Sequence, residues 1–148
     1  MAETFIMMKP DAIERHLVDT LIQEIKKAGF RILDQKECIV DETIILDHYE
    51  EVIKRVSNPY FKEYILNAFV GKEVLCLKLE SDQDTTVEDF RILLGKTNPM
   101  EADKHSLRGK YGNDSYEKSG LEKRMLNNLI HASDSDENAK KEIELWFK

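Results

Sequence analysis

Hydrophobic residues recur along the chain with the spacing of strands in some stretches and of helices in others. Residues 4–8 (TFIMM) form a short apolar run that predicts a buried strand, which Lys9-Pro10-Asp11 ends. A helix is predicted from Ala12 to Gly29, because apolar residues recur at intervals of four and so lie on one face of a helix. These apolar positions are Ile13, Leu17, Leu21 and Ile25.

The middle of the chain continues this alternation of strand and helix. The pattern predicts an extended segment over 30–40, one helix from Asp41 to about Val56, a short helix over 60–69, an interior strand over 74–79, and a helix over 85–94. Asp41 is a favourable residue for the start of a helix, and the Ser57-Asn58-Pro59 sequence breaks one.

The last third of the chain begins with a polar stretch over 96–119. Long connections in compact domains are usually functional or disordered, so this stretch is a candidate for function. A short helix is predicted over 116–125 and a last short strand at 129–130. Ser133, Asp134 and Ser135 are then predicted to begin a final helix.

Four strands separated by helices predict one α/β (α+β) sandwich over residues 1–148. The ferredoxin-like arrangement, a four-stranded antiparallel sheet covered by helices, has the required number of strands. No linker or internal repeat divides the sequence.

Charge and composition narrow the classes of partner. The net charge of -7 argues against nucleic-acid binding, which needs a dense field of lysine and arginine. The longest apolar runs are too short to cross a bilayer, so no membrane partner is expected. Cys38 and Cys76 lie far apart in apolar runs, which favours reduced thiols in the cytoplasm.

Two short motifs are candidates for a functional site. The first of them does not meet the requirements of the P-loop that it resembles. Gly95-Lys96-Thr97 resembles the end of a P-loop, but Phe90 stands where that motif needs its first glycine. A helix is also predicted before this motif where a P-loop requires a strand. A helix end followed by a polar loop is the better interpretation.

The second motif is His131, placed between the last strand and the final helix. A single histidine there is more often structural than catalytic, but Ser133 and Asp134 begin a helix whose N-terminus favours an anion. Glu142, two to three turns along, can reach back toward the ring and fix its tautomer, leaving the other nitrogen as a nucleophile for phosphorus. The alternative is that Glu142 is an ordinary solvated helix charge.

Four segments together resemble the nucleoside diphosphate kinases: TFIMMKPDAIERHLV, GKTNP, SLRG and NLIHASDSDENAKKEIELWF. They occur in the family's order and are spread over residues 4–147, nearly the whole length of the chain. The resemblance implies a ferredoxin-like sandwich and a ping-pong transfer of the γ-phosphate of a nucleoside triphosphate, usually ATP, to a nucleoside diphosphate. It also implies Mg²⁺ as cofactor and a homo-oligomer, with a hexamer favoured over a tetramer.

The resemblance assigns roles around the nucleophile. His131 matches the histidine that is phosphorylated, and Glu142 and Ser133 match the pair that orients its ring. Lys9 matches the lysine that contacts phosphate and the sugar hydroxyl, and Tyr49 matches a tyrosine close to both.

The resemblance also assigns nucleotide contacts. Arg91 and Arg108 match the two arginines that hold the phosphates, and Thr97 matches a hydroxyl donor to them. Asn128 matches the amide that reads the ribose 3′-hydroxyl, and Asp134 matches an outer ligand of Mg²⁺. For the base, Tyr60 matches the stacking aromatic, with Phe61 as the alternative, and Tyr64 falls near a second apolar contact.

Two departures from the family pattern leave questions open. The segment from Gly109 to Leu126 is longer than in common members, so base contacts from it cannot be transferred. Ala12 and His16 stand where the family has glycines, and His16 is expected on the surface of the helix. The alternative function is a nucleotide-binding or phosphohistidine-carrying regulatory protein of the same fold with little turnover.

Overall fold

A four-stranded antiparallel sheet lies at the centre of the protein. The structure is a computed structural model that describes residues 2–148. The sheet has the order β2-β3-β1-β4, and every neighbouring pair is antiparallel. Its strands are β1 (Glu3–Met8), β2 (Arg31–Ile39), β3 (Glu73–Glu80) and β4 (Ile130–Ala132). This arrangement confirms the predicted fold class.

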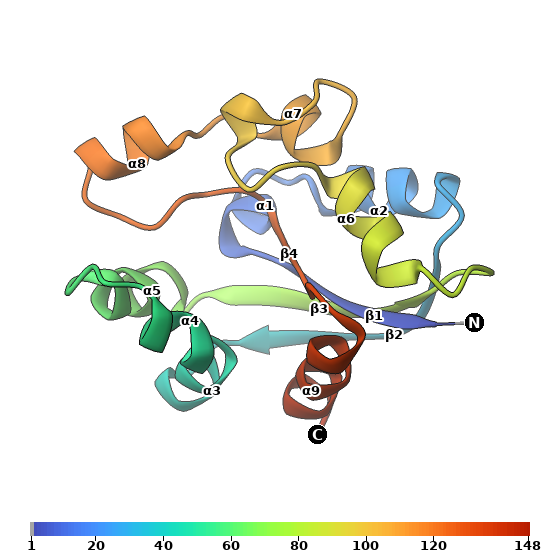
Figure 1. Cartoon of the computed structure of the whole chain (residues 1–148), viewed down its shortest axis with the longest axis horizontal. Helices are drawn as coiled ribbons and strands as arrows, with labels where there is room; N and C mark the ends of the chain where they lie inside the picture. Colours follow the sequence, from blue (N-terminus) through green and yellow to red (C-terminus); the bar gives the residue numbers. More distant parts are fainter. Residues whose placement is uncertain (1) are drawn as a thin grey trace.

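Helices cover both faces of the sheet (Figure 1). One face is covered by α1 (Pro10–Glu14), α2 (Val18–Lys27), α6 (Thr86–Leu94) and α7 (Leu107–Tyr111). The other is covered by α3 (Glu42–His48), α4 (Glu50–Arg55), α5 (Phe61–Phe69) and α9 (Asp136–Trp146). The 3₁₀ helix η1 (Pro99–Glu101) and α8 (Tyr116–Leu121) belong to the long connection before β4.

The two faces have separate apolar cores, and β1 contributes to both. Side chains alternate between the faces of a strand, so Phe5 and Met7 enter one core while Ile6 and Met8 enter the other. All four side chains are fully buried. β3 is buried along most of its length, as predicted for an interior strand, whereas β2 is an edge strand with mostly exposed or half-buried residues.

The single helix predicted from Ala12 to Gly29 is wrong, because the chain forms α1 and α2 with a turn between them. His16 adopts a positive φ of 57° in that turn, a left-handed conformation in which a helix cannot continue. Its side chain is exposed, but it lies in a turn and not on a helix surface. A glycine would adopt this positive φ without the steric cost that a side chain adds.

The helix predicted from Asp41 to Val56 is also divided. Asp41 begins α3 as predicted, and its carboxylate accepts a hydrogen bond of 2.8 Å from the backbone N–H of Ile44. α3 then ends at Tyr49, with φ -99° and ψ 11°, and α4 begins at the next residue. The apolar pattern runs through this break because both helices pack on the same core.

The predictions for the end of the chain need three corrections. The polar stretch over 96–119 contains η1 and α7, and α8 ends at Leu121, near Lys123 with its positive φ of 54°. The final helix begins at Asp136, and only Ser135 caps it, by accepting a 3.0 Å hydrogen bond from the backbone N–H of Asn138. Ser133 and Asp134 therefore precede the helix and are available for other contacts.

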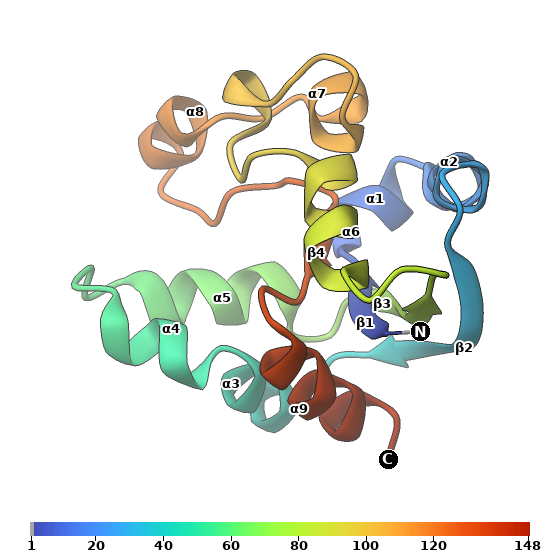
Figure 2. The same ribbon diagram turned by 45° about the vertical axis from the view of Figure 1, so that its right-hand side comes forward.

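The connection that contains α7 and α8 lies farther from the sheet than α1 and α6 do, in both views (Figure 1, Figure 2). α8 is at the end of the molecule that also carries α4 and α5 (Figure 2). Among residues 2–148, none of the helices has the length and apolar character that crossing a membrane requires.

Candidate active site

The pairing of β1 with β4 brings together residues from opposite ends of the sequence. Met7 lies opposite His131, and the backbone N–H of Lys9 donates to the carbonyl of Leu129 at 2.8 Å. Ile130 and Ala132 enter the core under α6, so the alternation of the strand directs His131 to the other face, toward α3 and α9. Lys9 follows Met7 by two residues and reaches the same side, above the Phe69 ring.

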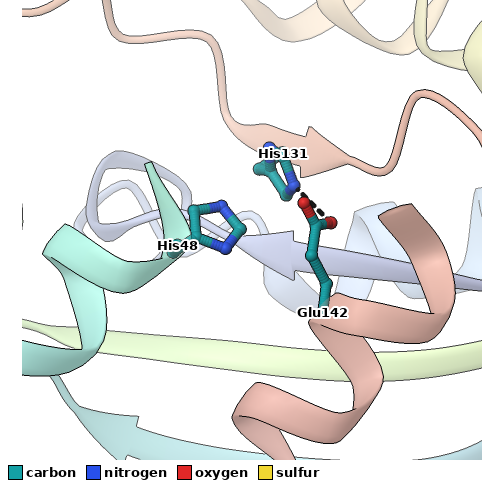
Figure 3. A group of neighbouring side chains, drawn as sticks. All are labelled: His48, His131 and Glu142. Atoms are coloured by element: carbon teal, nitrogen blue, oxygen red, sulfur yellow. Dashed lines mark hydrogen bonds and ion pairs between the residues drawn. The ribbon is translucent and has the colours of Figure 1, made fainter. Parts of the chain in front are cut away.

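Glu142 contacts the ring of His131 (Figure 3), and Ser133 supports Glu142. The Nε2 atom of His131 lies 2.9 Å from Oε1 of Glu142, and the Ser133 hydroxyl donates to the same oxygen at 2.5 Å. Burial acts to raise the pKa of Glu142, but the hydrogen bonds and charge of its neighbours hold this pKa below its usual value. An ionised carboxylate only accepts, so Nε2 carries the proton and Nδ1 keeps its lone pair. The structure thus gives His131 the tautomer of a nucleophile at Nδ1.

His48 is a further residue of this cluster that the sequence did not indicate. Its ring centroid lies 4.4 Å from that of His131 in an edge-to-face arrangement, and its Nδ1 accepts a 3.0 Å hydrogen bond from the indole N–H of Trp146. Burial, reinforced by the charge of His131, lowers the pKa of His48 to about 3. His48 is therefore neutral with its proton on Nε2, and it adds no positive charge beside the nucleophile. Its position directly before Tyr49 was the only available signal.

Tyr49 packs beside the nucleophile at the junction of α3 and α4. Its ring centroid is 6.4 Å from that of His131, and the residue is buried. Burial, with the Glu142 charge, raises the pKa of the Tyr49 phenol, so its hydroxyl remains protonated and able to donate. The break between the two helices is what turns this side chain inward from a position that looked like helix surface.

Lys9 and Asn128 form a buried polar pair. The Lys9 ammonium donates to Oδ1 of Asn128 at 2.9 Å and to the carbonyl of Leu126 at 3.2 Å. The Asn128 amide in turn donates to the carbonyl of Thr97 at 3.0 Å. Burial lowers the pKa of Lys9 to about 8; Asp11 opposes this shift and Arg108 reinforces it. Near neutral pH the ammonium is still mostly charged and can attract a phosphate.

Leu129, the residue after Asn128, has a positive φ of 72°. This conformation is unusual for a residue with a branched side chain, and local contacts maintain it. Its backbone N–H donates to the Asp11 carboxylate at 3.1 Å, and its carbonyl accepts from the N–H of Lys9. Asp11, which the sequence suggested only as the end of a strand, therefore fixes the turn that presents Asn128 and His131.

Arg108 is buried and holds the same turn from α7. Its guanidinium donates to the carbonyls of Asn128 at 3.1 Å, Gly95 at 3.3 Å and Ile130 at 2.6 Å. Burial, with the nearby charge of Arg91, lowers the pKa of Arg108 to about 10, which leaves it cationic at neutral pH. A guanidinium has five N–H donors, so three carbonyl contacts leave donors for a phosphate.

Three other predicted site residues are exposed at the edge of this cluster. They are Arg91 and Thr97, predicted to contact phosphate, and Asp134, predicted as an outer ligand of Mg²⁺. Arg91 is exposed on α6, and its guanidinium contacts the carbonyl of Ala132 at 3.4 Å, beside His131. The side chain of Thr97 is exposed in the loop after α6. Asp134 is exposed just before α9, where its carboxylate accepts from the Asn138 amide at 2.5 Å.

The predicted base contacts are on the α4–α5 side of the molecule. Tyr60 is 59% exposed, and its ring stacks on that of Tyr64 with centroids 6.4 Å apart. Phe61, the alternative stacking residue, is instead half-buried against the core of that face. Of the two side chains, that of Tyr60 is the more exposed.

The cluster at His131 does not suit Mg²⁺. Within residues 2–148, His48, His131 and Glu142 are the one group of potential ligand residues whose ligand atoms all lie within 4.8 Å of one another. Mg²⁺ prefers oxygen ligands and is commonly held by one or two carboxylates together with substrate phosphates. The exposed carboxylate of Asp134 can serve as such a carboxylate ligand, at a site where the nucleotide supplies most of the ligands.

Known proteins resemble this chain along its whole length. A family model described as nucleoside diphosphate kinase matches residues 2–148. A nucleoside diphosphate kinase from Exiguobacterium sibiricum is 36% identical over 148 residues, covering 100% of this chain and 96% of that protein.

Solved structures agree. A transition-state mimic of nucleoside-diphosphate kinase from Borrelia burgdorferi, with bound vanadate and ADP, has a TM-score of 0.91 at 27% identity and covers 99% of this chain and 86% of that one. The enzyme from Encephalitozoon cuniculi has a TM-score of 0.82 at 36% identity, covering 99% and 88%. The fold, the geometry around His131 and these matches lead to one conclusion: the chain belongs to the nucleoside diphosphate kinase family of phosphotransferases.

Proposed function

We propose that the protein transfers the γ-phosphate of a nucleoside triphosphate, with ATP as donor, to a nucleoside diphosphate through a phosphohistidine on His131. The observation that carries this proposal is the hydrogen bond from His131 Nε2 to the half-buried Glu142 carboxylate, which leaves Nδ1 as the attacking atom. Ser133 supports Glu142 from the other side, so the ring has one orientation before the substrate arrives.

The first half-reaction needs one bond to form and one to break. The Nδ1 lone pair attacks the γ-phosphorus, and the bond from that phosphorus to the bridging oxygen breaks, so the nucleoside diphosphate leaves with the electron pair. Positive charge then develops on the imidazole ring, where the Glu142 carboxylate stabilises it. In the second half-reaction a terminal phosphate oxygen of the acceptor diphosphate attacks the same phosphorus, and the N–P bond breaks.

Cations around the turn would neutralise the phosphates. We propose that Lys9 and Arg108 bind them from the buried side and Arg91 and the Thr97 hydroxyl from the rim. Tyr49 would donate its hydroxyl beside His131. Catalysis of this kind depends mainly on positioning and charge, and these groups are already ordered by protein contacts.

The nucleoside would extend toward Tyr60 and Tyr64. A base can stack on the exposed ring of Tyr60 whatever its identity, because every base has a π-face, and Asn128 would read the ribose 3′-hydroxyl. Asp134 is the carboxylate that we propose to hold Mg²⁺, which would supply positive charge against the phosphates when bound.

We also propose the wider setting of the enzyme. The exposed edge of β2 supports a homo-oligomer, since an unpaired edge can join another copy, and the family resemblance favours a hexamer over a tetramer. The unpaired thiols of Cys38 and Cys76 support a cytoplasmic location. Nucleotides are then the partners, without nucleic acid or membrane, and residues 1–148 act as one domain.

A two-step labelling experiment tests the proposal. The protein is incubated with γ-labelled ATP and Mg²⁺, separated from free nucleotide, and then given unlabelled GDP. We expect an acid-labile label on the protein that moves rapidly to GDP. A label that forms but stays would support the regulatory alternative, and a protein that takes no label would contradict both.

A further inference from the structure

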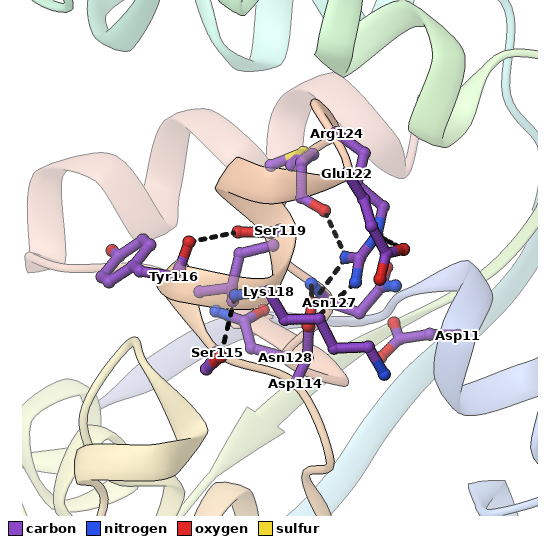
Figure 4. Close-up of polar contacts among 12 residues, drawn as sticks. Asp11, Asp114, Ser115, Tyr116, Lys118, Ser119, Glu122, Arg124, Asn127 and Asn128 are labelled. Carbon is purple, nitrogen blue, oxygen red and sulfur yellow. Dashed lines mark hydrogen bonds and ion pairs between the residues drawn. The ribbon is translucent and has the colours of Figure 1, made fainter.

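A partly buried ion pair between Arg124 and Asp114 links two parts of the long segment between Arg108 and Asn128 (Figure 4). The guanidinium of Arg124 meets the carboxylate of Asp114 through two parallel contacts, of 2.7 Å and 2.9 Å. Asp114 is only 4% exposed. Burial acts to raise the pKa of Asp114, but hydrogen bonds from Arg124 and from two backbone N–H groups lower this pKa to about 2. The pair is therefore charged under all ordinary conditions.

Asp114 also holds the backbone of the catalytic turn. Its carboxylate accepts a 2.8 Å hydrogen bond from the N–H of Asn127. Leu126 and Asn128 flank that residue, and they supply the two acceptors of the Lys9 ammonium, the carbonyl of Leu126 and Oδ1 of Asn128. A shift of the backbone at Asn127 would move both acceptors at once. Because Asp114 is hydrogen-bonded to Asn127, it acts on both contacts that position Lys9.

The charge of Asp114 reaches Lys9 as well. The charged groups that act on the ammonium come from three elements: Asp11 of α1, Arg108 of α7 and Asp114 of the long segment. His48 of α3 is neutral. The two carboxylates favour the charged ammonium and Arg108 disfavours it. Asp114 has the smallest of these effects, in part because it is already paired with a cation.

We propose that the Asp114–Arg124 pair is a positioning device for Lys9, through which the inserted segment sets the geometry and the protonation of a phosphate-binding group. The proposal rests on the phosphate role proposed for Lys9. It gives a function to the segment that the family resemblance left without one, and it predicts that the segment acts on the phosphate end of the site through the turn at Asn127.

The surroundings of the pair make it suitable for substitution. Arg124 and Asn127 line two hollows, of about 180 and 250 Å³, so the Arg124 side of the pair opens to space and not to packed core. Glu24 offers a matched control, because it accepts hydrogen bonds from Lys110 and Tyr111 and so ties the start of the same segment to α2. Its contacts do not include Lys9 or the catalytic turn.

The test compares three variants with the control Glu24→Gln. In Asp114→Ala the N–H of Asn127 loses its acceptor, and we expect kcat/KM to fall about tenfold. Asp114→Asn keeps an oxygen at the same place and should recover part of that loss. Arg124→Gln leaves the carboxylate and its contact with Asn127 in place. Circular dichroism and thermal unfolding identify variants that fail to fold. If Asp114→Ala is among them, the test relies on Asp114→Asn and Arg124→Gln.

Protonation of Lys9 provides a readout that a purely structural role would not move. NMR titration of the Lys9 ammonium in the isotopically labelled apoenzyme, assigned with Lys9→Met, measures its pKa without any turnover. Removing the negative charge in Asp114→Asn should lower this pKa, whereas removing the positive charge in Arg124→Gln should raise it. Opposite shifts, with no shift in Glu24→Gln, support the proposal.

Two results would overturn it. The first is an unchanged Lys9 pKa in both charge variants together with a kcat/KM within about twofold of the Glu24→Gln control. The second is a loss of activity that follows thermal stability alone, in all variants including the control. Since the titration does not depend on phosphate transfer, an inactive protein with shifted Lys9 values would contradict the proposed function and leave this inference standing.

Discussion

The nucleophile and the inserted segment each depend on one carboxylate, but the two carboxylates are held differently. Glu142 lies on α9, an 11-residue helix packed on the sheet through Trp146, and its direction follows from that packing. Asp114 lies in a connection far from the sheet, and Arg124 and backbone N–H groups hold it. Glu142 is positioned by the packing of the apolar core. Asp114 is positioned by an ion pair, which the pattern of apolar residues does not predict.

The difference explains which part of the site is robust. A carboxylate on a packed helix moves only if the core is repacked, which is costly in a close-packed interior. A carboxylate in a loop depends on its local partners, and the loss of the Arg124 guanidinium leaves the Asp114 charge buried without an opposite charge beside it. We therefore expect changes at the nucleophile to affect chemistry with little effect on folding, and changes in the inserted segment to affect Lys9 indirectly.

The largest expected effect comes from removing the nucleophile itself. His131→Ala should abolish the acid-labile label and reduce transfer by at least about 10⁴-fold, because no other group can form the N–P bond. The measurement is γ-phosphate labelling followed by transfer to GDP. His105→Ala, which removes an exposed histidine from the loop after η1, is the control and should behave as the unmodified protein.

Removing the buried guanidinium is the next largest change. Arg108→Ala should lower kcat by about 10²- to 10³-fold, because the phosphate loses a preorganised donor and the carbonyls of Asn128 and Ile130 lose theirs. Steady-state kinetics with ATP and GDP measure this loss. Arg108→Lys keeps the charge but not the fork, so an activity equal to the unmodified protein would contradict the role assigned to the guanidinium.

A smaller effect is expected from Glu142→Gln, which directly tests the packed side of the comparison. The amide can donate to Nε2 of His131, which would favour the tautomer that places the proton on Nδ1, the attacking atom. We expect kcat to fall about 10- to 100-fold with thermal stability nearly unchanged. Retention of full labelling rates would show that Glu142 does not set the tautomer.

The smallest expected effect is a change in the pH dependence of folding stability, which depends on His48. The folded protein keeps His48 neutral down to a pKa of about 3, whereas in the unfolded chain it binds a proton near its usual value of 6.5. The unfolded state thus binds more protons in this window, so the stability due to neutral His48 is present above pH 6.5 and is lost as the pH falls toward 3.

His48→Gln removes that titration. At neutral pH the variant should be less stable by about 1 kcal/mol, since the contact with Trp146 is altered. As the pH falls, the unmodified protein should lose up to about 1.4 kcal/mol per pH unit more than the variant. Urea unfolding at several pH values measures both slopes, and parallel curves would contradict the assignment of a neutral His48 in the folded protein.

The parts of the fold predicted correctly from the sequence are those with a clear period. β1, β3 and α5 follow directly from apolar runs and four-residue spacing, and the fold class follows from their order. The failures fall where the backbone turns without a break in the apolar pattern. His16 and Tyr49 both interrupt predicted helices, because a left-handed residue or a helix junction can leave the buried face continuous.

The sequence by itself determined the class of fold, the position of the nucleophile and the family, because local periodicity and short motifs encode them. Only the tertiary structure decided that His48 packs beside His131 and accepts a hydrogen bond from Trp146, and that Ser133 precedes the final helix without capping it. It alone connects Asp114 to Lys9, residues 105 positions apart by number. Such contacts join groups whose separation in sequence carries no signal, and they form only when strands β1 and β4 meet in the sheet.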